Sequence, residues 1–237
     1  MSKEIPAVTY NQQQRIAALQ HCSAFQNLHE QEIACMLSCM DARELSYQTN
    51  EYILRMGDTT QSFGIVLEGG VRIQRSDIWG NAMILGYAKQ FDVFGESYAC
   101  VPQAQLLVDA IAARPSRILF LKLKTILQPS MRGCPHHAKL AANLLQLSAQ
   151  KNIQLAERSI HTNPRTIRGK ILAYLSTEAT RAKSTRFTIP FNRQELADYL
   201  GVDRAALSSE MSRLQRDQIL YTRRSQFELL VAPEELS

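Results

Sequence analysis

The sequence lacks a long apolar run. No stretch of its 237 residues approaches the roughly 18 consecutive apolar residues that a membrane-spanning helix needs. Its start also lacks the charged-then-apolar pattern of an export signal. These two absences argue against a membrane span and against secretion, and we predict a cytoplasmic protein.

The sequence also lacks a cysteine framework. The five cysteines, Cys22, Cys35, Cys39, Cys100 and Cys134, include no Cys-x-x-Cys pair. Such an odd and scattered set argues against a disulfide scaffold and does not have the spacing of a tetrahedral zinc site. Cys35 and Cys39 fall one turn apart on an expected helix, and we interpret them as buried small hydrophobic residues.

The residue patterns of enzymes are absent as well. The histidines are dispersed, and the adjacent His136 and His137 would point to different sides of any helix. The sequence has no nucleophile–base pairing, no metal-ligand spacing and no phosphate-cradling glycine loop. We therefore predict no enzyme, no metal site and no cofactor.

The charge that is present is unevenly placed. Residues 1–133 carry 12 Lys plus Arg and 12 Asp plus Glu, whereas residues 134–237 carry 15 and 10 and supply the whole net charge of +5. A neutral front joined to a basic back is typical of a sensor domain coupled to a nucleic-acid-binding module. The alternative is a merely soluble basic surface.

The front half changes its pattern near residue 43. Between residues 10 and 40 apolar residues recur every three or four positions, which predicts helices. From residue 43 to about 123 the apolar segments are short and bounded by turn residues, which predicts a β-sandwich or barrel-like roll. In its middle, residues 91–98 (FDVFGESY) predict a strand, a turn and a short helix aimed at a small ligand.

A long helix is predicted from about residue 136 to 160. It carries two adjacent apolar seams, one formed by Leu140, Leu144 and Leu147 and the other by Ala141, Leu145, Ser148 and Leu155. Two seams indicate two packing partners, and the alternative is a helix buried in a monomeric core. Residues 162–164 (TNP) then interrupt the helix, because proline disfavours helix at the residue before it.

The stretch from Phe191 to Leu220 predicts two helices around a glycine turn. Asn192 and Glu195 form a capping box for the first helix. Gly201 ends that helix, and Asp203 caps a second one that carries apolar residues at helical spacing. This pattern is typical of a helix-turn-helix, although a plain helical hairpin needs much of it too.

The exposed face of the second helix favours DNA. Its side chains are short and polar, so the face can lie close to base edges, and its arginines can reach guanine or phosphate. Residues 219–223 and 226–231 would form a hairpin wing whose arginines sit on phosphates. The predicted DNA-contacting residues are Arg193, Gln194, Asp203, Arg204, Ala205, Ser208, Ser209, Ser212, Arg213, Arg223 and Arg224.

Taken in order, these motifs resemble the Crp/Fnr superfamily of bacterial transcription regulators. The resemblance rests on residues 67–73 (LEGGVRI), Phe94-Gly95-Glu96, and the helix-turn-helix from residue 192 (NRQELADYLGVDRAALSSEMSRL). It implies an α+β protein in three parts. These are an effector-sensing β-roll of the cyclic-nucleotide-binding type with N-terminal helices (1–133), a dimerisation helix (134–161) and a winged helix-turn-helix (162–237).

The sequence departs from this family where cyclic AMP would bind. Members that bind cyclic AMP carry an Arg-Ser or Arg-Thr pair about ten residues after the Phe-Gly-Glu motif, and here the count reaches Leu106-Leu107. Burying a phosphate without a cation costs several kcal/mol. We therefore predict that the protein does not use cyclic AMP. Its effector is unknown: a largely apolar or aromatic ligand is one expectation, and the absence of any effector is another.

Other ligands of the family leave different traces. The iron–sulfur members carry a tight N-terminal cysteine cluster that this chain does not reproduce, whereas haem binding leaves no motif strict enough to exclude it. Glu96 would either contact a ligand or bind the amides of its own short helix. The residues expected at an effector site are Gly95, Glu96, Ser97, Leu106, Leu107 and Leu144.

We predict a homodimeric, effector-controlled transcription regulator that binds a pseudo-palindromic double-stranded DNA site and contacts RNA polymerase. In the cyclic-AMP-responsive members the recognition helix begins with Arg-Glu and has another arginine five residues after the first. Here Arg204 matches the first arginine, but Ala205 and Ser209 replace the other two residues, so a different operator is expected. The alternative function is a small-molecule-binding protein whose helix-turn-helix contacts another protein.

Overall fold

The computed structural model describes residues 11–76, 82–123, 126 and 136–231. Within it the chain forms two compact units, Met1–Gln150 and Lys151–Ser237. The boundary between them lies inside the long helix that the sequence predicts as a separate segment. None of the helices in the described ranges is both long enough and apolar enough to cross a bilayer.

Short helices open the first unit. They are α1 (Gln12–Leu19), η1 (Ser23–Phe25) and α2 (Glu30–Cys39). Side-chain caps account for where the two α-helices begin: Asn11 Oδ1 accepts the N–H of Gln14 at 2.8 Å, and Glu32 Oε2 accepts the N–H of His29 at 2.7 Å. The predicted helical character of residues 10–40 is confirmed.

The interpretation of the α2 cysteines as buried residues is wrong for Cys35. Cys35 is exposed and Cys39 is only partly buried. The buried face of α2 is formed by Ile33, Met36 and Leu37, and Cys35, two residues from Ile33, points about 200° away from it. The apolar spacing predicts the helix correctly, but it does not show on which side of the apolar face Cys35 lies.

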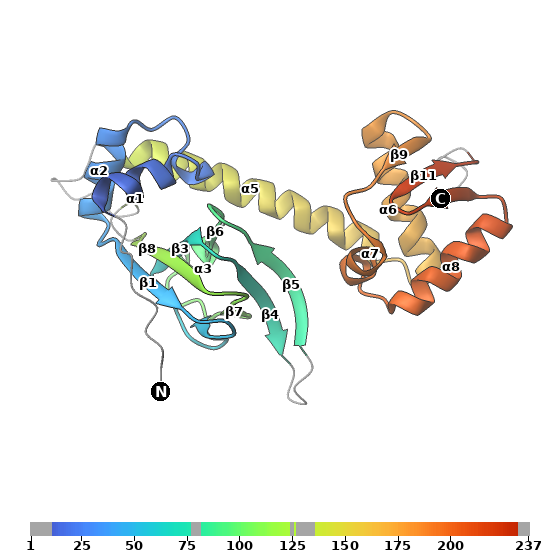
Figure 1. Ribbon diagram of the computed structural model, residues 1–237, viewed down its shortest axis with the longest axis horizontal. Helices are drawn as coiled ribbons and strands as arrows, with labels where there is room; N and C mark the ends of the chain where they lie inside the picture. Colours follow the sequence, from blue (N-terminus) through green and yellow to red (C-terminus); the bar gives the residue numbers. More distant parts are fainter. Residues whose placement is uncertain (1–10, 77–81, 124–125, 127–135, 232–237) are drawn as a thin grey trace. The chain divides into compact units, whose positions relative to one another are not determined.

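Two four-stranded antiparallel sheets follow (Figure 1). The first has the order β1 (Arg43–Tyr47), β8 (Ser116–Lys122), β3 (Ser62–Glu68), β6 (Val93–Phe94). The second has the order β2 (Tyr52–Leu54), β7 (Asp109–Ala112), β4 (Val71–Ser76), β5 (Ala82–Ala88). These short strands confirm the predicted β-roll.

Side chains of the two sheets share one buried cluster, which includes Val66, Val71 and Ile118. Phe94 belongs to the same cluster, and its ring lies against the backbone of Gly64. A Cβ atom at position 64 would meet that ring at 2.4 Å. Close approach of the ring therefore requires glycine at this point of β3.

Two further helices with described bounds belong to the first unit. They are α3 (Glu96–Cys100) and α5 (His137–Thr162), which continues into the second unit. Leu140 and Leu144 on α5 are buried in the cluster that contains α1 and α2, whereas Leu145 and Leu155 are 72% and 65% exposed. The first predicted seam thus packs within the chain, and the second is open to solvent.

The second unit holds the C-terminal elements. They are α6 (Ile167–Ala182), β9 (Arg186–Thr188), α7 (Arg193–Leu200), α8 (Arg204–Arg216), β10 (Leu220–Arg223) and β11 (Gln226–Leu229). The strands form one antiparallel sheet in the order β10, β11, β9. The helices and the sheet share a buried core that includes Leu175, Leu200, Leu207 and Leu229.

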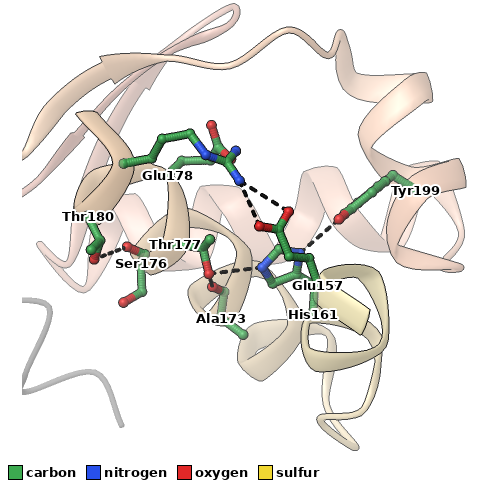
Figure 2. Close-up of polar contacts among 9 residues, drawn as sticks. Glu157, His161, Ala173, Ser176, Thr177, Glu178, Thr180 and Tyr199 are labelled. Carbon is green, nitrogen blue, oxygen red and sulfur yellow. Dashed lines mark hydrogen bonds and ion pairs between the residues drawn. The ribbon is translucent and has the colours of Figure 1, made fainter. Parts of the chain in front are cut away.

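The last turns of α5 are tied to α6 and α7 through His161 (Figure 2). His161 is 2% exposed, with Nε2 2.9 Å from Thr177 Oγ1 and Nδ1 2.9 Å from Tyr199 Oη. Because the Thr177 hydroxyl donates to the carbonyl of Ala173, it accepts from Nε2–H, and the Tyr199 hydroxyl donates to Nδ1. The neutral imidazole therefore satisfies both bonds.

Two ionic contacts support the same end of α5. Arg181 of α6 binds both carboxylate oxygens of Glu157 at 3.1 Å. Arg158 donates to the carbonyls of Tyr199 and Asp198, at 3.0 and 3.2 Å, near the C-terminal end of α7. Cations at these carbonyls also oppose the negative end of the helix dipole. The last turns of α5 thus fix the first helix of the helix-turn-helix.

Buried His161 should make stability depend on pH. Burial lowers the pKa of His161 below its usual 6.5, so the unfolded chain binds the proton more readily than the folded one. The free energy of unfolding should therefore fall as the pH drops through 6.5 and below, and be recovered above it.

The measurement is urea unfolding of the wild type and His161→Gln between about pH 8 and pH 5. The stability advantage of the wild type over the variant should shrink as the pH falls. A difference that stays constant across this range would contradict the assignment of a neutral buried imidazole.

Candidate nucleic-acid interface

The first helix of the motif, α7, begins as predicted. Asn192 Oδ1 accepts the N–H groups of Gln194 and Glu195 at 2.9 and 3.0 Å, and Glu195 Oε2 accepts the N–H of Asn192 at 2.8 Å. This reciprocal capping box satisfies backbone donors that a helix start otherwise leaves unpaired. Leu196, Ala197 and Leu200 form its buried face.

The turn into α8 also follows the predicted chemistry. Gly201 has φ +63°, the left-handed conformation that glycine adopts without strain. Asp203 then caps α8, its Oδ1 accepting the N–H of Ala206 at 2.8 Å. Val202 packs against the core between the two helices. The geometry is that of a helix-turn-helix with both ends of the turn capped.

Burial of one side of α8 leaves the other side to solvent. Leu207, Met211 and Leu214 are at most 2% exposed. On the opposite side Arg204, Ala205, Ser209, Ser212 and Arg213 are exposed, and Ser208 is partly buried. The six predicted contact residues of this helix therefore lie on its accessible side.

The arginines of that face differ in their bonding. Arg213 lies 3.4 Å from Glu210 Oε2, whereas Arg204 has no hydrogen bond or ion pair to any residue that the structure describes. Ser212 Oγ donates to the carbonyl of Ser208 at 3.0 Å. Arg204, at the N-terminal end of α8, is thus the cation on this face that is most available to a ligand.

The wing places two arginines at its turn. Arg223 ends β10 and Arg224 follows it with φ +57°, and both side chains are exposed. A groove of about 440 Å³ lies beside this turn and the start of α7. Its lining residues are Ile189, Pro190, Phe191, Asn192, Arg193, Glu195, Arg224 and Ser225.

Two predicted contact residues on α7 take part in internal bonds. Arg193 is partly buried, donates to Thr222 Oγ1 at 3.0 Å and lies over the ring of Phe227, 5.3 Å from its centroid. Its burial lowers the pKa of its guanidinium from the usual value. Gln194 is exposed and donates to Asp198 Oδ1 at 2.8 Å. Arg193 therefore holds the wing sheet against α7.

The residues expected at an effector site have different surroundings. Gly95, with φ +77°, precedes α3, and Glu96 in its first turn is 3% exposed, whereas Ser97 is exposed. Leu106 is 3% exposed and Leu107 is 61% exposed. Neighbouring leucines thus occupy opposite environments.

Leu144 lies in the cluster formed with α1 and α2. Leu106 is held by backbone hydrogen bonds to Gly57 and Asp58, each 2.8 Å long. The Leu107 N–H points to Tyr98 Oη at 3.4 Å. Leu106 and Leu107 lie about ten residues after the Phe-Gly-Glu motif, where cyclic-AMP-binding members of the family carry a cation and a hydroxyl. Both positions here have hydrophobic side chains.

Several residues that position the helix-turn-helix were not identified from the sequence. Contacts of His161 and Arg158 with Tyr199 hold the end of α5 against α7. In the sequence His161 is one of five dispersed histidines. The signal that was available was a histidine in the last helical turn before the break at residues 162–164. Its partners lie 16 and 38 residues away, so no local pattern identifies them.

Two domain families match the chain, one in each part. The cyclic nucleotide-binding domain family matches residues 44–130, and the Crp-like helix-turn-helix domain family matches residues 169–236. The first match covers the β-roll, and the second covers most of α6 and the whole helix-turn-helix and wing.

Two curated relatives each align with almost three quarters of the chain. The chain is 22% identical over 184 residues to the transcriptional activator protein FnrL of Cereibacter sphaeroides, covering 74% of this chain and 71% of that one. It is 25% identical over 179 residues to the nitrogen fixation regulation protein FixK of Bradyrhizobium diazoefficiens, covering 73% and 72%.

Solved structures share the fold. One is the c-di-GMP-responsive global regulator CLP of Xanthomonas campestris, at 17% identity and a TM-score of 0.56 over 86% of this chain and all of that one. Another is CprK in complex with OCPA, at 18% identity and a TM-score of 0.56 over 83% and 89%.

The two matches fall on the chain in the predicted order, with the cyclic nucleotide-binding domain before the Crp-like helix-turn-helix domain. The resemblance predicted from the sequence is therefore confirmed. The chain belongs to the Crp/Fnr family of transcription regulators, which are not enzymes, bind DNA through the helix-turn-helix and act as dimers.

Proposed function

We propose that this protein is a homodimer whose α8 helices read a pseudo-palindromic DNA site in two successive major grooves. The exposed face of α8 supports this proposal, because alanine and serine side chains allow close approach to base edges and Arg204 has no partner to give up among the residues that the structure describes. Half-sites would lie about one helical turn apart.

Phosphate contacts come from the rim of this face. Arg223 and Arg224 project from the wing turn, and Gln194 stands at the start of α7, whereas the Asp203 carboxylate caps α8 and only positions that helix. Residues 134–237 carry 15 basic and 10 acidic side chains, so the field around the helix-turn-helix attracts a polyanion. Arg193 acts here by positioning the wing.

The second seam of α5 provides the dimer contact in this proposal. Its two large apolar side chains are strongly exposed in the single chain: Leu145 is 72% and Leu155 is 65% exposed. A second copy of the same helix would bury them without disturbing the first seam. The proposal also includes contact with RNA polymerase and control of the dimer by an effector.

Cyclic AMP is not the effector in this proposal. Leu106 is buried and Leu107 is exposed at the positions where cyclic-AMP-binding members carry a cation and a hydroxyl. Neither leucine can neutralise a buried phosphate, and an uncompensated buried charge is costly. An apolar or aromatic ligand fits these side chains better, and regulation without an effector is the other outcome.

The DNA assignment is tested by two arginine variants on an operator obtained by in vitro selection. Arg204→Ala should reduce discrimination between this operator and random DNA by about 1 to 3 kcal/mol, because a base contact is lost. Arg224→Ala should weaken binding to both DNAs alike and lower the salt slope by about 1. Fluorescence anisotropy at several salt concentrations measures both effects.

The two variants control for one another, since each removes one arginine from the same domain. Equal losses on operator and random DNA for both variants would contradict the assignment of α8 as the reading helix. Circular dichroism establishes that both variants keep the wild-type fold.

The dimer contact is tested by Leu155→Asp. A charge on the exposed seam should convert the dimer to a monomer, because burying an unpaired carboxylate in an apolar interface is strongly unfavourable. Light scattering coupled to gel filtration reports the mass. The control is Gln154→Asp at the adjacent exposed position, which should remain dimeric, and a dimeric Leu155→Asp would place the interface elsewhere.

The effector assignment is tested by titration calorimetry with cyclic AMP. No isotherm in the micromolar range is expected, because the cation that would hold the phosphate is missing. Saturable micromolar binding of cyclic AMP at one site per chain would overturn this part of the proposal.

A further inference from the structure

A thiol and an imidazole meet where α2 ends and α5 begins. Cys39 is the last residue of α2, and its Sγ lies 2.9 Å from Nε2 of His137, the first residue of α5. Sγ also lies 3.3 Å from the carbonyl oxygen of Met36. Cys39 is partly exposed. Its thiol is therefore paired with a nitrogen base and is still accessible to small molecules.

The nearby carboxylate of Glu32 binds Lys139 and His136. Glu32 Oε1 lies 2.8 Å from Lys139 Nζ and 3.0 Å from His136 Nδ1. The hydrogen bond from Lys139, and then the backbone bond from His29, lower the pKa of Glu32 to about 2. Glu32 is thus an anion already neutralised by a lysine, and it engages His136 and not His137.

The state of His137 suits a proton acceptor. Burial, and then the neighbouring His136, lower the pKa of His137 from its usual value. Its imidazole is therefore neutral near pH 7 and can take the thiol proton. The first turn of the 26-residue helix α5 lies at the same point, and the positive end of its dipole favours a thiolate.

We propose that Cys39 is an oxidation site that reacts with hydroperoxides, with His137 as its base. His137 Nε2 takes the proton, and the thiolate attacks one peroxide oxygen, so that an S–O bond forms as the O–O bond breaks. With hydrogen peroxide the sulfur is oxidised by two electrons to a sulfenic acid. The departing hydroxide is protonated from His137 to water.

The other described cysteines show whether exposure alone would select Cys39 for oxidation. Cys35 lies one turn earlier on α2 and is more exposed than Cys39. Cys100 is also exposed as a residue. Partial burial of its thiol, and then Glu96, nevertheless raise the pKa of that thiol and keep it protonated. Cys22 is 1% exposed. If exposure alone governed oxidation, Cys35 and Cys100 would react first; pairing with a base selects Cys39.

The test treats the full-length protein with limiting hydrogen peroxide and alkylates the remaining thiols at intervals. Peptide mass spectrometry then quantifies the loss of alkylatable thiol at each cysteine. This loss records the sulfenic acid and any disulfide that forms from it. Cys39 should be consumed about tenfold faster than Cys35, because His137 raises the thiolate fraction of Cys39 above the few per cent that a cysteine of ordinary pKa carries at neutral pH.

Two adjacent histidines supply a matched pair of variants. His137→Gln removes the base and should bring the Cys39 rate down to that of Cys35. His136→Gln leaves in place burial, the larger cause of the lowered His137 pKa, and should therefore change the Cys39 rate less than about twofold. Circular dichroism and DNA binding of the untreated variants establish that both are folded.

Equal rates at Cys39 and Cys35 in the wild type would overturn the inference. So would a folded His137→Gln variant in which Cys39 still reacts at the wild-type rate. The readout is independent of DNA, so failure of this inference and failure of the proposed DNA-reading role are separate results.

Discussion

The packing of one face of α8 is the constraint on which the DNA-binding unit depends. Leu207, Met211 and Leu214 are at most 2% exposed, and their burial fixes the rotation of the helix about its axis. A helix rotated by half a turn would expose these three side chains and bury Arg204, whose charge no residue in the described part of the chain compensates. The same hydrophobic contacts that stabilise the unit therefore select the face that is left for DNA.

The contacts around α7 extend this constraint to the end of α5. Arg158 binds carbonyls near the C-terminal end of α7, and His161 joins Tyr199 of α7 to Thr177 of α6. The hydrogen bonds of His161 satisfy a neutral imidazole in a site with almost no exposure. Arg193 on the same helix holds the wing by its bond to Thr222. These polar bonds position the surface that contacts DNA, and none of them has to be broken to expose Arg204.

Local chemistry made much of this predictable from the sequence. The capping box at Asn192, the left-handed Gly201 and the cap at Asp203 are each specified within four residues, and all three occur as expected. The error at Cys35 has a different origin, because helical spacing does not show which residues at the border of an apolar face are covered. Contacts such as Cys39 with His137, 98 residues apart, depend on how distant elements meet. No spacing rule predicts them.

Charge compensation governs the chemistry of two regions in the first unit. At Leu106 a buried hydrophobic side chain stands where a phosphate-binding member needs a cation, so an anionic ligand has nothing to pair with at that position. At Glu32 the opposite holds: Lys139 and His136 surround the carboxylate. Burial, and then His136, lower the pKa of His137, so this imidazole is uncharged beside the Cys39 thiol. In both places the chemistry open to the protein follows from which charge already has a partner, and this depends on contacts between elements far apart in the chain.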